Sequence, residues 1–180
     1  MSKIIVLNGS PRKGGNTDIL TSQFVKGAME NNQVEIVSVT EYKVNPCIGC
    51  NTCFNREGNR CFQNDDMAEI YNKLMSADIV VAASPVYFYG LSAQLKMIID
   101  RLHTPMRNNF RIRKLALLLA GAAELPELFD SIITQYNLIL NYFNLEDLGK
   151  VLVRGVKDKG DIVGNPALEQ AYLLGKSIVD

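Results

Sequence analysis

The first seventeen residues decide the fold, because they read as a buried strand, a glycine-rich turn and the start of a helix. Residues 4–17 are IIVLNGSPRKGGNT. The β-branched run Ile4–Leu7 is typical of a strand, and Asn8–Pro11 is a cluster of turn residues. Thr17 then opens a stretch that runs to about Asn31 with apolar residues at helical spacing. Strand, loop and helix in this order form the first unit of a parallel α/β fold.

The rest of the chain repeats this alternation. Continuous apolar runs between amphipathic stretches predict a parallel sheet with helices on both faces. We expect a single domain over residues 1–180, built on a doubly wound five-stranded sheet with strand order 2-1-3-4-5. Such a sheet binds ligands beyond the carboxyl ends of strands 1 and 3. The further strands are expected at 34–39, 79–83, 115–120 and 150–156, and the further helices at 65–75, 92–102, 127–143 and from Asn165 onward.

Composition narrows the class of protein. The 180 residues include 19 Lys and Arg against 19 Asp and Glu, so the formal net charge is zero. This balance excludes a generic basic nucleic-acid binder and an acidic disordered chain. No apolar run approaches the length of a membrane span. The chain starts directly in strand-like residues, without the pattern of a signal peptide, so we expect a cytoplasmic protein. From the charge balance and the short apolar runs we expect no nucleic-acid partner and no membrane partner.

The loop Gly9–Thr17 is a candidate phosphate site. The N-terminus of a helix presents unsatisfied N–H groups and a partial positive charge to an anion. The spacing is neither G-x-G-x-x-G nor a Walker A motif, which disfavours a dinucleotide fold and an NTPase. The alternative is a turn in which Asn16 or Thr17 only caps the helix. The residues suited to phosphate are the donors Ser10, Asn16 and Thr17, the glycines Gly14 and Gly15, and the cation Arg12.

The loop after the third strand, Ser84–Gly90, carries three consecutive aromatic residues, Tyr87, Phe88 and Tyr89. Three neighbouring aromatics in a loop cannot all point into one core. A planar heteroaromatic ring can stack on them or be held by their backbone. The alternative is that two of them fill gaps between helices. Together the two loops suit a flat ring that carries one phosphate.

Both loops resemble those of the NADPH-dependent FMN reductase and iron–sulfur flavoprotein group of the flavodoxin-like superfamily. The resemblance rests on Asn8-Gly9-Ser10-Pro11-Arg12-x-Gly14-x-Asn16-Thr17 and Ser84-Pro85-Val86-Tyr87-Phe88-x-Gly90, followed by Ala93-Gln94-Leu95-Lys96 and Ile99-Asp100-Arg101. It implies a flavodoxin-like fold, FMN as cofactor and NAD(P)H as co-substrate. It implies that Ser10, Arg12, Asn16 and Thr17 bind the FMN phosphate, and that Pro85, Val86, Tyr87, Phe88 and Gly90 border the isoalloxazine ring. The loop Gly121–Glu124, which should close the other side, matches the group's pattern poorly.

All four cysteines lie within one predicted loop, 45–64, as Cys47, Cys50, Cys53 and Cys61. The spacing C-x2-C-x2-C-x7-C is typical of a metal site, and two successive x2 gaps favour an iron–sulfur cubane over zinc. It also resembles the compact cysteine motif of iron–sulfur flavoproteins, which hold a [4Fe-4S] cluster. The alternatives for these cysteines are uncoordinated thiols, a redox disulfide and a zinc site.

Two functions of different class follow from these sites. The first is an FMN-dependent NAD(P)H oxidoreductase that reduces an acceptor, with no catalytic acid or base required for hydride transfer. The second is an iron–sulfur flavoprotein that carries electrons between FMN and ferredoxin-like partners. A zinc-binding interaction module is a third, weaker alternative. The apolar stripe along 127–143 is wider than one sheet face requires, which predicts a homodimer or homotetramer. Arg101 is expected to face solvent.

Overall fold

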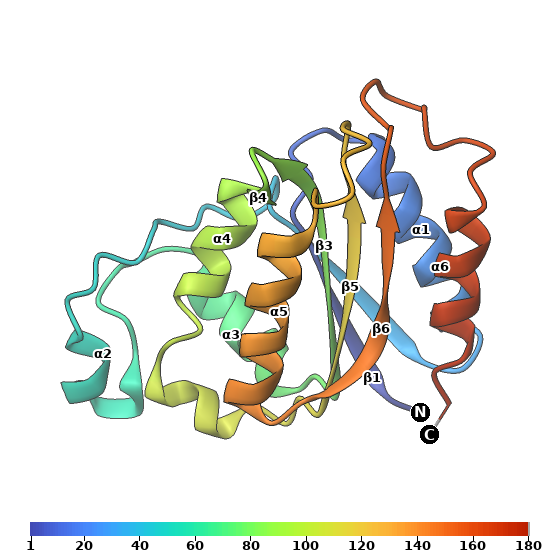
Figure 1. Cartoon of the computed structure of the whole chain (residues 1–180). Helices are drawn as coiled ribbons and strands as arrows, with labels where there is room; N and C mark the ends of the chain where they lie inside the picture. Colours follow the sequence, from blue (N-terminus) through green and yellow to red (C-terminus); the bar gives the residue numbers. More distant parts are fainter. Residues whose placement is uncertain (180) are drawn as a thin grey trace.

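The computed structural model describes residues 1–179 and has five parallel strands in the order β2-β1-β3-β5-β6 (Figure 1). This confirms the predicted order 2-1-3-4-5. The strands are β1 (Lys3–Asn8), β2 (Gln33–Ser38), β3 (Ile79–Tyr87), β4 (Gly90–Leu91), β5 (Lys114–Ala120) and β6 (Glu146–Val153). The helices are α1 (Asn16–Ala28), α2 (Thr52–Asn55), α3 (Met67–Met75), α4 (Ala93–Asp100), α5 (Asp130–Phe143) and α6 (Ala167–Lys176), with short 3-10 helices at Glu57–Asn59 and Pro105–Asn109.

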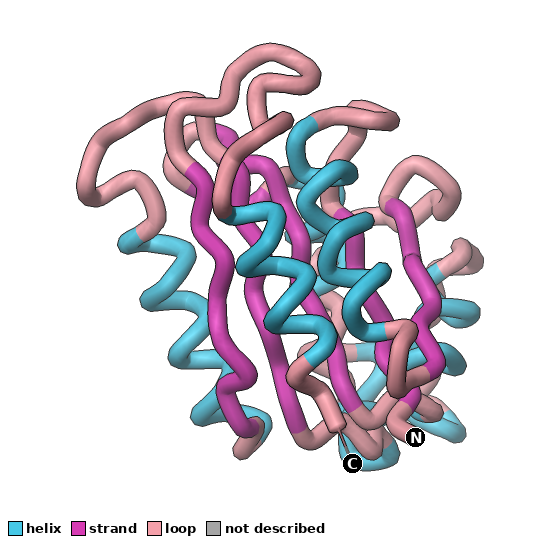
Figure 2. Tube along the Cα trace, turned by 90° about the vertical axis from the view of Figure 1, so that its right-hand side faces the viewer, coloured by secondary structure: helices cyan, strands magenta, loops and turns pink. Residues whose placement is uncertain are grey.

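Alternation of side chains along β1 divides the core into two layers. Ile4 and Val6 pack with residues of α1 and α6 on one face of the sheet. Ile5 and Leu7 pack with residues of α3, α4 and α5 on the other face. Figure 1 shows these two groups of helices on opposite sides of the strands, and Figure 2 views the sheet from the α1 and α6 side. Because both faces are covered, β1 and β3 are apolar almost throughout.

Helices α1 and α6 cross in direct backbone contact at two glycines. A Cβ atom on Gly27 would lie 2.0 Å from the carbonyl oxygen of Tyr172. A Cβ atom on Gly175 would lie 2.2 Å from the carbonyl oxygen of Phe24. Only glycine permits this approach, so the crossing fixes α6, and with it the loop that precedes α6, against α1.

The structure departs from the predicted elements in a few places. The strand β4 is an addition, because Gly90–Leu91 folds back on Val86–Tyr87 as an antiparallel hairpin. The helix α1 ends at Ala28, three residues before the predicted end. The helix α5 begins at Asp130, after a turn over residues 126–129. Within residues 1–179, no helix is long and apolar enough to cross a membrane.

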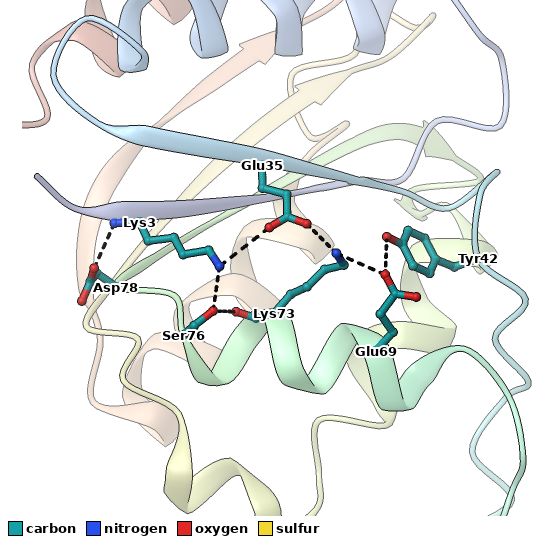
Figure 3. A network of polar contacts seen from close by, with 7 residues as sticks. All are labelled: Lys3, Glu35, Tyr42, Glu69, Lys73, Ser76 and Asp78. Carbon is teal, nitrogen blue, oxygen red and sulfur yellow. Dashed lines mark hydrogen bonds and ion pairs between the residues drawn. The ribbon is translucent and has the colours of Figure 1, made fainter.

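A network of charged side chains ties α3 to the outer strand β2 (Figure 3). The ammonium group of Lys73 lies 2.5 Å from a carboxylate oxygen of Glu35 on β2 and 3.2 Å from one of Glu69. These hydrogen bonds raise the pKa of Lys73. Lys3 adds a hydrogen bond of 2.8 Å to the Ser76 hydroxyl. The network fixes α3, the helix that follows the cysteine loop, at the edge of the sheet.

Candidate functional site

A pocket of 200 Å³ lies at the carboxyl ends of β1 and β3, where both predicted loops meet. Four segments line it: the phosphate loop, the aromatic loop, the end of β5 with the loop that follows it, and a segment at 156–158 that the sequence did not suggest. The lining residues are Ser10, Arg12, Gly15, Asn16, Thr17, Pro85, Val86, Tyr87, Ala120, Ala122, Val156, Lys157 and Asp158. Seven of the nine predicted cofactor residues are therefore gathered in one place, and Phe88 and Gly90 lie outside the lining.

The phosphate end of the pocket is the N-terminus of α1. Gly15 occupies the N-cap position, and no side chain caps the helix. Within residues 1–179, the backbone N–H groups of Asn16, Thr17 and Asp18 have no hydrogen-bond acceptor. The alternative that Asn16 or Thr17 merely caps the helix is therefore wrong. The unsatisfied donors and the helix dipole make this end of the pocket suited to an anion.

Some side chains at this end of the pocket hold the phosphate loop in shape, and others remain available to a ligand. Thr17 is 3% exposed, and its hydroxyl has no partner in the described part of the chain. The Ser10 hydroxyl lies 3.2 Å from the carbonyl oxygen of Arg12, which shapes the loop. The Asp18 carboxylate accepts the backbone N–H of Gly14 at 2.7 Å and the Asn8 amide at 2.8 Å. The loop is thus held by Asp18 and Ser10, while Thr17 and the exposed Arg12 remain available to a ligand.

Asn16 is placed differently from the other predicted phosphate residues. Its side-chain oxygen accepts the backbone N–H groups of Gly160 and Ile162, at 3.1 and 3.3 Å. Its side-chain nitrogen donates to the carbonyl oxygen of Asp158 at 2.8 Å. These bonds dock the turn 158–162 beside the phosphate loop and bring Lys157 to the pocket. No local sequence signal marks Lys157, because the contact joins segments more than 140 residues apart.

The ring end of the pocket is the β3–β4 hairpin. Pro85, Val86 and Tyr87 line the pocket, and Ala120 and Ala122 close it from β5 and the loop that follows. Phe88 is 98% exposed at the hairpin tip, and its ring lies 6.0 Å from that of Tyr89. The alternative that two of the three aromatics fill gaps between helices is not what the structure has, since Tyr87, Phe88 and Tyr89 are all exposed.

The hairpin tip is strained. Val86 pairs with Leu91 and Tyr87 with Gly90, which leaves Phe88 and Tyr89 as a two-residue loop. Their φ angles are +48° and +62°. Positive φ at both positions is the geometry of a type I′ turn, which favours Asn and Gly. Each bulky residue in this region costs about 1–3 kcal/mol, a strain that clusters at functional sites.

The cysteine loop leaves the carboxyl end of β2 and runs away from the pocket to the far end of α4 (Figure 1). All four cysteines are free; Cys47 and Cys50 are exposed, and Cys53 and Cys61 are half-buried. The Thr52 hydroxyl lies 3.1 Å from the Cys50 sulfur and lowers the pKa of that thiol. Among residues 1–179, no three Cys, His, Asp or Glu side chains are grouped closely enough to hold a metal ion.

Arg101 clamps both ends of the cysteine loop, so the expectation that it faces solvent is wrong. Its guanidinium pairs with Asp65, and the two side chains are 3% and 4% exposed. It also donates to the carbonyl oxygen of Asn45 at 3.3 Å, and Asn45 donates its backbone N–H to Asp65 at 2.8 Å. Burial alone would raise the pKa of Asp65, but the hydrogen bonds from Arg101 and Asn45 outweigh it, so the pKa is lowered.

Replacing Phe88 with Asn and Tyr89 with Gly should raise the free energy of unfolding by about 1–2 kcal/mol, because these residues accept positive φ. Chemical denaturation measures this. The control is Phe88→Ala, which removes the exposed ring and keeps a Cβ atom at the strained position, so it should not stabilise. A double variant no more stable than the wild type would show that the hairpin carries no strain.

Asp65→Asn should destabilise the fold by about 3 kcal/mol, because it leaves the buried Arg101 charge without its partner. Since the folded-state pKa of Asp65 is lowered, its contribution is present above the unfolded value of about 3.9 and is lost as the pH falls through the folded value. The stability difference between wild type and variant should therefore be constant from pH 7 to about pH 4 and should shrink only as the pH is lowered further. Asp66→Asn is the matched control, because Asp66 accepts from the Lys43 backbone in an exposed position. Equal stability of both variants at pH 7 would contradict the clamp.

Comparison with known proteins shows which family the chain is similar to. The sequence matches the family model of the NADPH-dependent FMN reductases over residues 2–130. An iron-sulfur flavoprotein of Methanocaldococcus jannaschii is 44% identical over 112 residues, which cover 62% of this chain and 56% of that protein's length. An iron-sulfur flavoprotein of Archaeoglobus fulgidus is 32% identical over 184 residues, covering 99% of this chain and 79% of that protein.

The fold is shared with solved structures of lower identity. An NAD(P)H:quinone oxidoreductase from Methanothermobacter marburgensis superposes with a TM-score of 0.78 at 15% identity, and the match covers 98% of each chain. The family match spans the phosphate loop, the cysteine loop, the aromatic hairpin and α4. The chain therefore belongs to the NADPH-dependent FMN reductase family.

Proposed function

We propose that this protein is an FMN-dependent oxidoreductase that takes reducing equivalents from NADH or NADPH and passes them to an acceptor. One observation carries the proposal: the unsatisfied N–H groups of α1 share a pocket with the base of the aromatic hairpin. A phosphate end and a planar-ring end in one pocket suit FMN. When bound, FMN supplies the hydride and electron chemistry.

In this proposal the residues of the pocket bind and orient the cofactor. The N–H groups of the first turn of α1, the Thr17 and Ser10 hydroxyls and the Arg12 guanidinium hold the phosphate. Pro85, Val86 and Tyr87 border the ring. Phe88 and Gly90 shape the hairpin at its edge, and the exposed Phe88 ring is available to a molecule that approaches the flavin. No acid or base is required at the pocket.

Identification of the released cofactor tests the proposal. The protein is heated, the supernatant is chromatographed against FMN and FAD standards, and the reconstituted protein is assayed for NADH and NADPH oxidation with a quinone acceptor. FMN in the supernatant together with turnover supports the proposal. Recovery of mainly FAD, or of no flavin after reconstitution, would overturn it.

We propose as a second function that the cysteine loop holds an iron–sulfur cluster that exchanges electrons with a ferredoxin-like partner. The names of the two relatives and the four thiols on one loop support it. The donor set has the chemistry of a [4Fe-4S] site. Within residues 1–179, however, Cys47, Cys50, Cys53 and Cys61 are not gathered as such a site requires. An anaerobic absorption spectrum separates the cases: a broad absorbance bleached by dithionite beside the flavin bands supports a cluster, and flavin bands alone refute it.

We further propose that the chain forms a homodimer or homotetramer through the face between α4 and α5. A largely apolar groove of 440 Å³ lies there, lined among others by Leu138, Tyr142 and His103. Leu138 is 64% exposed and Tyr142 is 53% exposed, both on α5. If two copies pack together through this face, both side chains are removed from water, and the cysteine loop of one copy comes closer to the other copy.

Thr17→Val should weaken FMN binding between about tenfold and a hundredfold, because it removes a donor to a charged group worth about 1.5–3 kcal/mol. Titration of the flavin-free protein by calorimetry measures the affinity. Thr21→Val is the control, since its hydroxyl is buried on the same helix without a partner in residues 1–179. Equal affinity of wild type and Thr17→Val would remove Thr17 from the site.

Leu138→Glu combined with Tyr142→Glu should lower the mass measured by light scattering to that of one chain, because each carboxylate would have to be desolvated at the interface. Leu173→Glu is the control, with 52% exposure on the opposite face of the sheet. A monomeric wild type at micromolar concentration would contradict the oligomer, and an unchanged mass for the double variant would exclude this face.

A further inference from the structure

The family resemblance places Asn16 among the phosphate ligands, but its side chain is already occupied. An asparagine amide has two donor hydrogens and an acceptor oxygen with two lone pairs. The oxygen accepts from Gly160 and Ile162, and the nitrogen donates to Asp158. Both lone pairs and one of the two hydrogens are therefore spent on the turn 158–162.

That turn presents a lysine to the pocket. The backbone N–H groups of Lys157 and Asp158 both donate to the Asp161 carboxylate, at 2.9 and 2.7 Å, which closes the turn on itself. Lys157 lines the pocket with Ser10, Arg12 and Thr17. Its ammonium group has no hydrogen-bond or ion-pair partner in the described part of the chain. The turn is thus a preformed arm, attached to α1 through Asn16, that carries an unpaired cation.

The ammonium group of Lys157 decides the net charge of the residues that line the pocket. Arg12, Lys157 and Asp158 are the charged residues of its lining. A phosphate monoester carries a charge of about −1.5 to −2 at pH 7. With Lys157 the lining has a net charge of +1, and without it Arg12 is balanced by Asp158. The second cation on the turn, Lys159, donates to the carbonyl oxygen of Lys13 at 3.0 Å and lies against Gly14, outside the lining.

We propose that Lys157 binds the phosphate group of the flavin, and that Asn16 is a positioning residue that holds Lys157 there through the turn 158–162. The proposal rests on the proposed function, because it takes FMN as the ligand of this pocket. It adds to the site a residue outside the region of the family match, which ends at residue 130. It also gives Asn16 a different role from that of Ser10 and Thr17.

The test is a double-mutant cycle read with two ligands. Flavin-free wild type, Lys157→Met, Asn16→Ala and the combined variant are titrated with FMN and with riboflavin, which lacks the phosphate. Lys157→Met should weaken FMN about tenfold, the loss of one charged contact, and leave riboflavin affinity unchanged. Asn16→Ala should act on FMN alone as well, and the combined variant should be no weaker than the weaker single variant, because Asn16 acts through Lys157.

Lys13→Met is the control for net charge, because Lys13 is exposed on the phosphate loop and does not line the pocket. If the losses of FMN affinity in the two single variants multiply in the combined variant, Asn16 contacts the phosphate independently of Lys157. That result would overturn the positioning role of Asn16. Equal FMN affinity of Lys157→Met and wild type, or an equal loss in Lys13→Met, would overturn the role of Lys157. Lys157 is exposed, so its variant tests the proposal even if Asn16→Ala fails to fold. A wild type that binds neither flavin refutes the proposed function instead.

Discussion

The absence of a side chain at Gly9 is the constraint on which the pocket depends. A Cβ atom there would lie 2.8 Å from that of Leu95, 2.9 Å from the Ser92 hydroxyl and 3.1 Å from the Ala83 carbonyl oxygen. The Gly9 N–H instead donates to that carbonyl at 2.7 Å, which continues the β1–β3 ladder by one residue. Because β1 ends opposite Ala83 while β3 continues to Tyr87, the phosphate loop starts beside the part of β3 that leads into the aromatic hairpin. The switch point of a doubly wound sheet becomes a binding site through this contact.

The sequence pattern was sufficient to predict the strands and the two loops, because both are local. The strand order then followed from the alternation of strands and helices. Apolar runs of strand length, a glycine-rich turn before a helix and an aromatic loop each depend on neighbouring residues. The β3–β4 hairpin was missed because its tip is Phe88-Tyr89 in place of the usual Asn-Gly. Lys157 and the Arg101–Asp65 pair were missed because each joins segments far apart in the chain, and a charged residue viewed alone is most often a surface residue.

Each of the two candidate sites holds a strained or costly feature. The hairpin keeps two aromatics at positive φ beside the pocket, and the cysteine loop is closed by a buried ion pair. A buried pair of this kind seldom stabilises a fold more than apolar residues would, and its best-attested use is to specify one arrangement. Arg101 fixes where the cysteine loop begins and ends, at Asn45 and Asp65, while Cys47 and Cys50 stay exposed.

Helix α4 connects these two regions. At its start, the Ser92 backbone N–H donates to the Ser84 hydroxyl on β3, beside the pocket. At its end, Arg101 and Thr104 bind the cysteine loop, the latter through the Asn59 carbonyl oxygen at 3.2 Å. None of the residues that line the pocket belongs to that loop. Within one chain the pocket and the cysteine loop therefore lie at opposite ends of α4.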